Sequence, residues 1–96
     1  MERRKLEEEE IAERLSAIEG WSIRDAFLTK RFEFANFAES LDFVNKVGAI
    51  AEDFDHHPDI TFGWGYAIID LTTHDRGGIT EFDFAVAFEI EDLRLS

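Results

Sequence analysis

The chain has 96 residues, which predicts one domain over residues 1–96 with residues 1–5 frayed, and the absence of cysteine excludes disulfide bonds and thiolate metal sites. Its 22 acidic and 10 basic residues give a formal net charge of -12, which argues against direct binding to nucleic acid or anionic membranes. No apolar run is long enough to span a bilayer and the N-terminus has no apolar segment, so we expect a cytoplasmic protein.

The first predicted element is a helix over residues 6–18. Ile11, Leu15 and Ile18 recur at helical spacing among good helix formers. A run of glutamates lies near the N-terminus of this segment, where the helix dipole favours negative charge. Gly20 is the expected stop.

Two strands are predicted next, over residues 21–24 and 27–34, with a hairpin turn at Asp25 and Ala26. Side chains at alternate positions of a strand share one face of the sheet. One face of the second strand consists of Leu28, Lys30, Phe32 and Phe34.

Asn36 is the expected N-cap of a helix over residues 37–54. Pro58 restricts the residue before it to extended geometry, so the helix must end before this proline. The predicted apolar stripe consists of Phe37, Leu41, Val44, Val47, Ala51 and Phe54.

A second strand pair is predicted over residues 60–64 and 66–73, followed by a loop over residues 75–78. Thr80 is expected to cap a last helix, with Asp83 three residues later in an arrangement similar to a capping box. The buried side of this helix is predicted to consist of Phe82, Val86 and Ile90.

The predicted order of elements is therefore α-β-β-α-β-β-α. Hairpin-connected strand pairs separated by helices indicate an α+β fold, a four-stranded antiparallel sheet with helices packed on one face. A sheet in so small a domain leaves edge strands to cover, so we expect a homodimer or homotetramer.

The three histidines of the chain are His56, His57 and His74. If the second strand pair forms a hairpin, its two ends return to the same place and bring these residues together. Imidazole titrates near neutrality, so a histidine cluster can donate and accept protons. Trp64 and Tyr66 add flat aromatic surface, and the combination suits a planar heterocycle that gains and loses protons.

Simpler interpretations compete with this one. A histidine pair is more often part of a surface turn or a helix C-terminus, and Trp64 would by default be a core residue of its strand. Three histidines can bind zinc, but adjacent side chains diverge in extended backbone, which makes His56 and His57 less natural as a ligand pair. Glu52 lies four residues before His56, so we expect the two to share a helical face and the carboxylate to orient the imidazole.

A single spacing pattern connects these residues: an acidic residue, His-His-Pro after three positions, an aromatic, a further histidine and an aspartate. The residues that fill it are Glu52, His56, His57, Pro58, Trp64, His74 and Asp83. In this pattern and in its predicted element order, the chain resembles the pterin-4a-carbinolamine dehydratase family. Gly63 and Gly65 depart from that family, in which side-chain-bearing residues usually flank the aromatic.

The resemblance implies a hydro-lyase of pterin cofactor recycling, which dehydrates 4a-hydroxytetrahydropterin to quinonoid dihydropterin plus water without a metal or an organic cofactor. It implies proton transfer by His57 and His74, and pterin binding with a share of acid catalysis by His56. The other residues for which it implies a binding or orienting role are Glu52, Pro58, Trp64, Asp75 and Asp83.

The resemblance also implies partners and alternatives. An aromatic amino acid hydroxylase that uses a pterin would supply the substrate. Members of the family also act as protein-binding factors in transcription-factor dimerisation and carboxylase assembly, so the main alternative is a non-catalytic scaffold of the same fold. A scaffold has no need of three histidines at this spacing, which favours the enzyme. A metal-dependent hydrolase is a third, weaker hypothesis.

Overall fold

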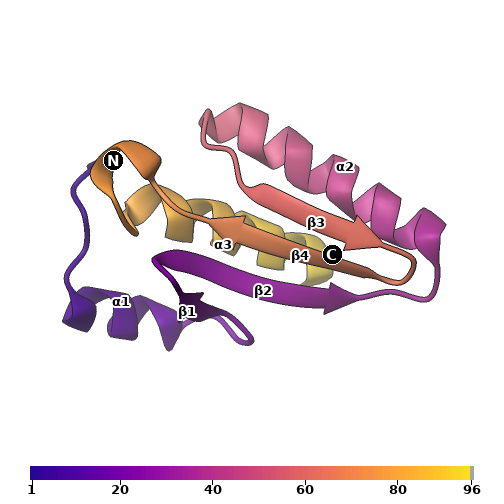
Figure 1. Cartoon of the computed structure of the whole chain (residues 1–96), viewed down its shortest axis with the longest axis horizontal. Helices are drawn as coiled ribbons and strands as arrows, with labels where there is room; N and C mark the ends of the chain where they lie inside the picture. Colours follow the sequence, from indigo (N-terminus) through magenta and orange to yellow (C-terminus); the bar gives the residue numbers. More distant parts are fainter. Residues whose placement is uncertain (96) are drawn as a thin grey trace.

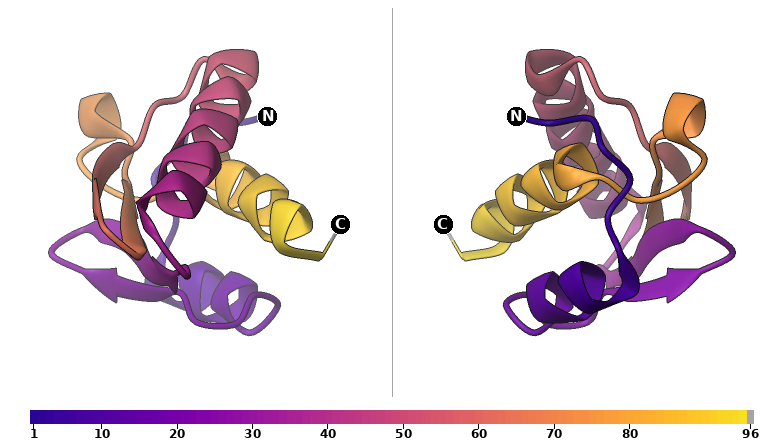
Figure 2. Two further views of the ribbon diagram at one scale, coloured as in Figure 1. Left: turned by 90° about the vertical axis from the view of Figure 1, so that its right-hand side faces the viewer. Right: turned by 90° about the vertical axis from the view of Figure 1, so that its left-hand side faces the viewer.

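The computed structural model describes residues 1–95, and its elements follow the predicted order. The strands pair antiparallel in the order β1-β2-β4-β3. They are β1 (Ser22–Arg24), β2 (Phe27–Glu33), β3 (Asp59–Gly63) and β4 (Tyr66–Leu71). The helices all lie on one face of this sheet (Figure 1, Figure 2), and they are α1 (Glu8–Leu15), α2 (Phe37–Phe54) and α3 (Glu81–Leu95). The predicted α+β architecture is confirmed.

The core lies between the sheet and the helices. Strand alternation turns Leu28 and Phe32 of β2 toward the helices, and both are at most 2% exposed. The other strand and helix residues in this layer that are at most 2% exposed include Ala67, Ile69, Leu71, Val47, Phe84, Val86 and Ile90. Because these side chains come from the sheet and from both helices, their burial holds α2 and α3 against the sheet.

The turn between β1 and β2 is confirmed at Asp25 and Ala26, which both adopt left-handed backbone with φ of 51° and 67°. Two consecutive residues of positive φ match the twist of a two-residue hairpin, for which asparagine and glycine are the usual choices. Alanine is unusual there, and the turn signal in the sequence is correspondingly weak.

The start of α2 is capped as predicted, since the side chain of Asn36 accepts a hydrogen bond from the backbone N–H of Glu39 at 2.9 Å. The predicted apolar stripe is wrong in its first turn, however, because Phe37 and Leu41 are 45% and 40% exposed. Ser40 is buried there instead. Its hydroxyl donates to the carbonyl oxygen of Asn36 and accepts from the backbone N–H of Gly65, so it ties α2 to the β3–β4 turn.

The first helix is shorter than the predicted range of 6–18. The backbone N–H of Leu6 donates to the carbonyl oxygen of Ile79 at 2.8 Å, and its side chain is 3% exposed in the core outside the helix. Glu10 accepts hydrogen bonds from Arg4 and from the backbone N–H of Glu7, and these bonds, that from Arg4 above all, lower the pKa of Glu10 to about 2.

The predicted buried side of the last helix is partly wrong. Val86 and Ile90 are fully buried, but Phe82 is only partly buried and Phe84 takes its place in the core. The predicted loop over residues 75–78 begins within a short 3-10 helix, His74–Arg76. No helix among residues 1–95 is long and apolar enough to cross a membrane.

Candidate active site

A cavity of about 300 Å³ lies where the chain leaves α2 and where it leaves β4. Its lining residues are Arg3, Asp55, His56, His57, Thr72, Thr73, His74 and Asp75. The antiparallel pairing of β3 with β4 brings the two ends of the hairpin together. The structure therefore confirms the expectation that the hairpin returns His74 to the neighbourhood of His56 and His57.

His56 is the buried member of the histidine trio, with 7% of its side chain exposed. Its Nε2 lies 2.6 Å from Oδ1 of Asp83, a side chain with no exposed surface. Oδ2 of Asp83 accepts hydrogen bonds from the hydroxyl of Thr73 and the backbone N–H of Thr80, both at 2.9 Å. With both carboxylate oxygens acting as acceptors, Nε2–H of His56 donates, and Nδ1 is the nitrogen left to act on a substrate.

His57 contacts a different carboxylate and has 54% of its side chain exposed, after Asp55 ends α2 in the left-handed conformation and turns the chain. This divergence was expected for adjacent residues. Glu52 does not orient His56 as expected. Its Oε2 lies 2.5 Å from Nε2 of His57, because the helix has already ended when the chain reaches His56. The partner of His56 is Asp83, on α3.

His74 begins the short 3-10 helix and is exposed, with its ring edge-on to Phe27 at a centroid distance of 6.1 Å. Asp75 follows it in the cavity wall, and its Oδ1 accepts a hydrogen bond from Nη2 of Arg3 at 2.5 Å. This bond is the main reason that the pKa of Asp75 lies below its ordinary value.

Four residues of the sequence pattern do not line the cavity: Glu52 and Asp83 hydrogen-bond to its histidines, whereas Trp64 and Pro58 do neither. Trp64 lies in the β3–β4 turn, at the opposite end of the hairpin from the histidines, and is 72% exposed. Pro58 joins His57 to the start of β3. Within a single chain, neither residue contributes a wall to this cavity, and a role for either in pterin binding stays a prediction.

Sequence reasoning missed Arg3, Asp55, Thr72 and Thr73 as lining residues. Thr72 and Thr73 were detectable in principle, because they directly precede His74 in the sequence. Arg3 gave no signal, since it lies in the segment that was expected to fray. The structure places Arg3 in the wall of the cavity. The fraying of residues 1–5 stays a prediction.

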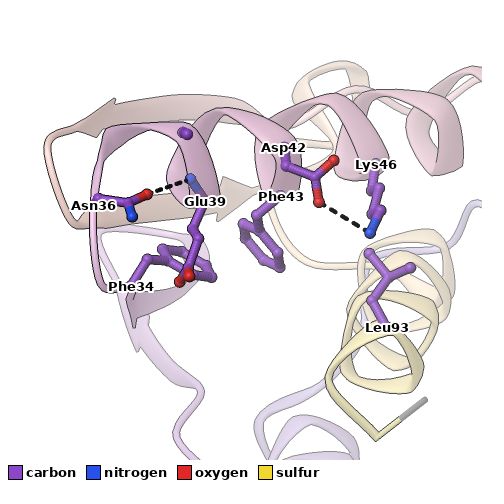
Figure 3. A pocket seen from close by; sticks show the side chains of 8 residues that line it. Phe34, Asn36, Glu39, Asp42, Phe43, Lys46 and Leu93 are labelled. Atoms are coloured by element: carbon purple, nitrogen blue, oxygen red, sulfur yellow. Dashed lines mark hydrogen bonds and ion pairs between the residues drawn. The ribbon is translucent and has the colours of Figure 1, made fainter.

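A larger cavity of about 510 Å³ lies between α2 and α3 (Figure 3). It contains the ion pair of Asp42 and Lys46 at 3.0 Å, and an apolar wall that includes Phe43 and Leu93. Its lining residues include no histidine, whereas those of the smaller cavity include three. Among residues 1–95, no group of His, Asp and Glu side chains has the arrangement of a metal site.

The family model for pterin 4 alpha carbinolamine dehydratase matches residues 4–93. A relative from Sulfolobus acidocaldarius with the provisional name pterin-4-alpha-carbinolamine dehydratase is 46% identical over 90 residues, 94% of this chain and 99% of the relative. A relative from Rubrobacter xylanophilus with the same provisional name is 46% identical over 92% of this chain and 83% of its own length.

Two solved structures are also similar. The crystal structure of a transcriptional coactivator/pterin dehydratase from Brucella melitensis has a TM-score of 0.88 at 31% identity and covers 93% of this chain and 97% of its own. A pterin dehydratase-like protein described as a RuBisCO assembly factor in the alpha-carboxysome has a TM-score of 0.63 at 28% identity, with 76% of this chain and 84% of its own covered. Sequence and fold agree over nearly the whole length, and the chain belongs to the pterin 4 alpha carbinolamine dehydratase family.

Proposed function

We propose that this chain catalyses the dehydration of 4a-hydroxytetrahydropterin to quinonoid dihydropterin plus water. The bond between C4a and the hydroxyl oxygen breaks, and the departing oxygen takes a proton from a general acid. A base removes the proton on N5, and the electron pair of that N–H bond forms the C4a=N5 double bond. The product re-enters pterin cofactor recycling, and a pterin-dependent aromatic amino acid hydroxylase is the class of enzyme that would supply the substrate.

The observation that carries this proposal is the meeting of three imidazoles in one cavity, two of them held by carboxylates. Hydroxide is a poor leaving group, so a positioned acid lowers the barrier, typically by about 10²–10⁴-fold. We assign proton transfer at the hydroxyl and at N5 to His57 and His74, and pterin binding with a share of acid catalysis to His56. In this scheme Asp83 orients His56 and Glu52 orients His57.

The imidazoles suffice for this scheme without a metal or an organic cofactor. A direct assay of the purified chain with 4a-hydroxytetrahydrobiopterin tests both the enzymatic function and its independence of a metal. We expect dehydration at least about tenfold faster than in buffer, and an equal rate after dialysis against a metal chelator. A rate no higher than that of buffer would refute the enzymatic function and favour a scaffold of the same fold. Activity lost on chelation and restored by zinc would refute the metal-free scheme.

We also propose that the chain forms a homodimer or a homotetramer. The edge strands β1 and β3 each have one unpaired side within the chain, which a second copy could cover. Phe37, Leu41 and Trp64 are large apolar residues that stay at least 40% exposed, and the ring of Phe37 stacks on Phe62 of β3. Light scattering at micromolar concentration should therefore give at least twice the mass of one chain, and a monomeric mass would contradict this.

A further inference from the structure

Two contacts hold the N-terminal segment against the rest of the protein close to the histidine cavity. It runs from α1 past the start of α3 (Figure 2), where the backbone N–H of Leu6 donates to the carbonyl oxygen of Ile79. Lys5 lies against Gly78 so closely that a Cβ at Gly78 would come within 2.8 Å of Cε of Lys5. These two contacts place the residues that precede Lys5 at the wall of the cavity.

Two contacts hold the guanidinium of Arg3 at that wall. Nη2 donates to Oδ1 of Asp75 at 2.5 Å, and the guanidinium carbon lies 5.3 Å from the ring centroid of Phe82. Phe82 in turn packs against His56, with ring centroids 5.6 Å apart. An arginine has five N–H donors in a planar fork, so the bond to Asp75 leaves others for a ligand. The side chain is 40% exposed and therefore accessible from the cavity.

The charge of Arg3 is unusual in its surroundings. Among the lining residues it is the one permanent cation, and the acidic residues Asp55 and Asp75 share the cavity with it. The chain as a whole has a net charge of -12. A guanidinium N–H can donate to a carbonyl oxygen, and hydrogen bonds from a charged donor are about twice as strong as neutral ones.

The substrate of the proposed reaction has such an oxygen next to the reacting carbon. Its pyrimidinone ring has an oxo group on C4, which is bonded directly to the C4a that loses hydroxide. When the imidazoles act at C4a and N5, this oxo group must lie in the same cavity as Arg3.

We propose that Arg3 is a substrate-binding residue, which donates hydrogen bonds to the 4-oxo group of the pterin ring. This assignment rests on the proposed function. Arginine stays protonated at every relevant pH, so Arg3 exchanges no proton with the substrate. Its contribution is to binding, and its loss should appear in KM more than in kcat.

The test compares Arg3→Ala with Arg4→Ala, which removes the same charge one residue away. Arg4 pairs with Glu10 and does not line the cavity. For Arg3→Ala we expect KM and the Kd for 7,8-dihydrobiopterin, a non-reacting ligand that keeps the 4-oxo group, to rise by at least about tenfold, with kcat within about threefold. Arg4→Ala should leave all three within about twofold of wild type. Arg3→Lys should be intermediate, because it keeps the charge and loses the fork.

Melting curves of each variant establish that the comparison is made on folded protein. If Arg3→Ala matches Arg4→Ala while wild type turns over normally, the assignment of Arg3 is overturned and the proposed function stands. A fall in kcat with KM and Kd unchanged would overturn it as well. If wild type neither dehydrates nor binds the pterin, the proposed function fails and the assignment of Arg3 fails with it.

Discussion

Asp83→Ala is expected to lower the free energy of unfolding by about 3–5 kcal/mol, because each buried donor left without its acceptor costs about 1–3 kcal/mol. The side chain of Asp83 has no exposed surface and accepts hydrogen bonds from His56, Thr73 and Thr80. Alanine leaves these donors buried without their acceptor. Urea denaturation followed by circular dichroism measures the change, which is a large part of the stability of a typical domain.

Two further variants separate the effect of the lost hydrogen bonds from the effects of lost side-chain volume and of a lost carboxylate on this helix. Asp83→Asn keeps the volume and one acceptor oxygen, so we expect a smaller loss of about 1–3 kcal/mol. Asp92→Ala removes an exposed carboxylate from the same helix and should change the free energy of unfolding by no more than about 0.5 kcal/mol. If Asp83→Ala were as stable as Asp92→Ala, the hydrogen bonds around Asp83 would not stabilise the fold.

His57→Ala and His74→Ala are each expected to lower kcat for dehydration by at least about tenfold, since a positioned acid or base contributes about 10²–10⁴-fold. Both residues are exposed at the cavity and outside the hydrophobic core. The melting temperature should therefore stay close to that of wild type, and lost activity can be attributed to the missing imidazole. Steady-state assays and thermal melts of the same preparations measure the two effects.

Arg76→Ala is the matched control for His74→Ala. Arg76 lies in the same short 3-10 helix, is exposed and does not line the cavity, so its loss should leave kcat within about twofold. Full activity in both histidine variants would sink the assignment of proton transfer to these residues. A loss of activity as large in Arg76→Ala would mean that the 3-10 helix, and not the imidazole, is what matters.

The elements were largely predictable because they depend on local chemistry. The Asn36 cap and the two hairpins follow from short-range patterns, and the structure confirms each of them. The apolar stripe of α2 failed in its first turn for a tertiary reason. Apolar residues lie on more than one side of that helix, and packing against the sheet buries Phe43 next to Ser40 while Phe37 stays exposed.

The candidate site was likewise predictable in part. The sequence by itself determined that histidines flank a hairpin, and because antiparallel strands return on themselves, it determined that His74 lies near His56 and His57. Only the tertiary structure decided the partners of the imidazoles. Asp83 reaches His56 from another helix, and Arg3 reaches the cavity from the other end of the chain. The resemblance implied an orienting role for Asp83, but neither the histidine that it contacts nor the position of Arg3 follows from local spacing, because these contacts form only when the core packs.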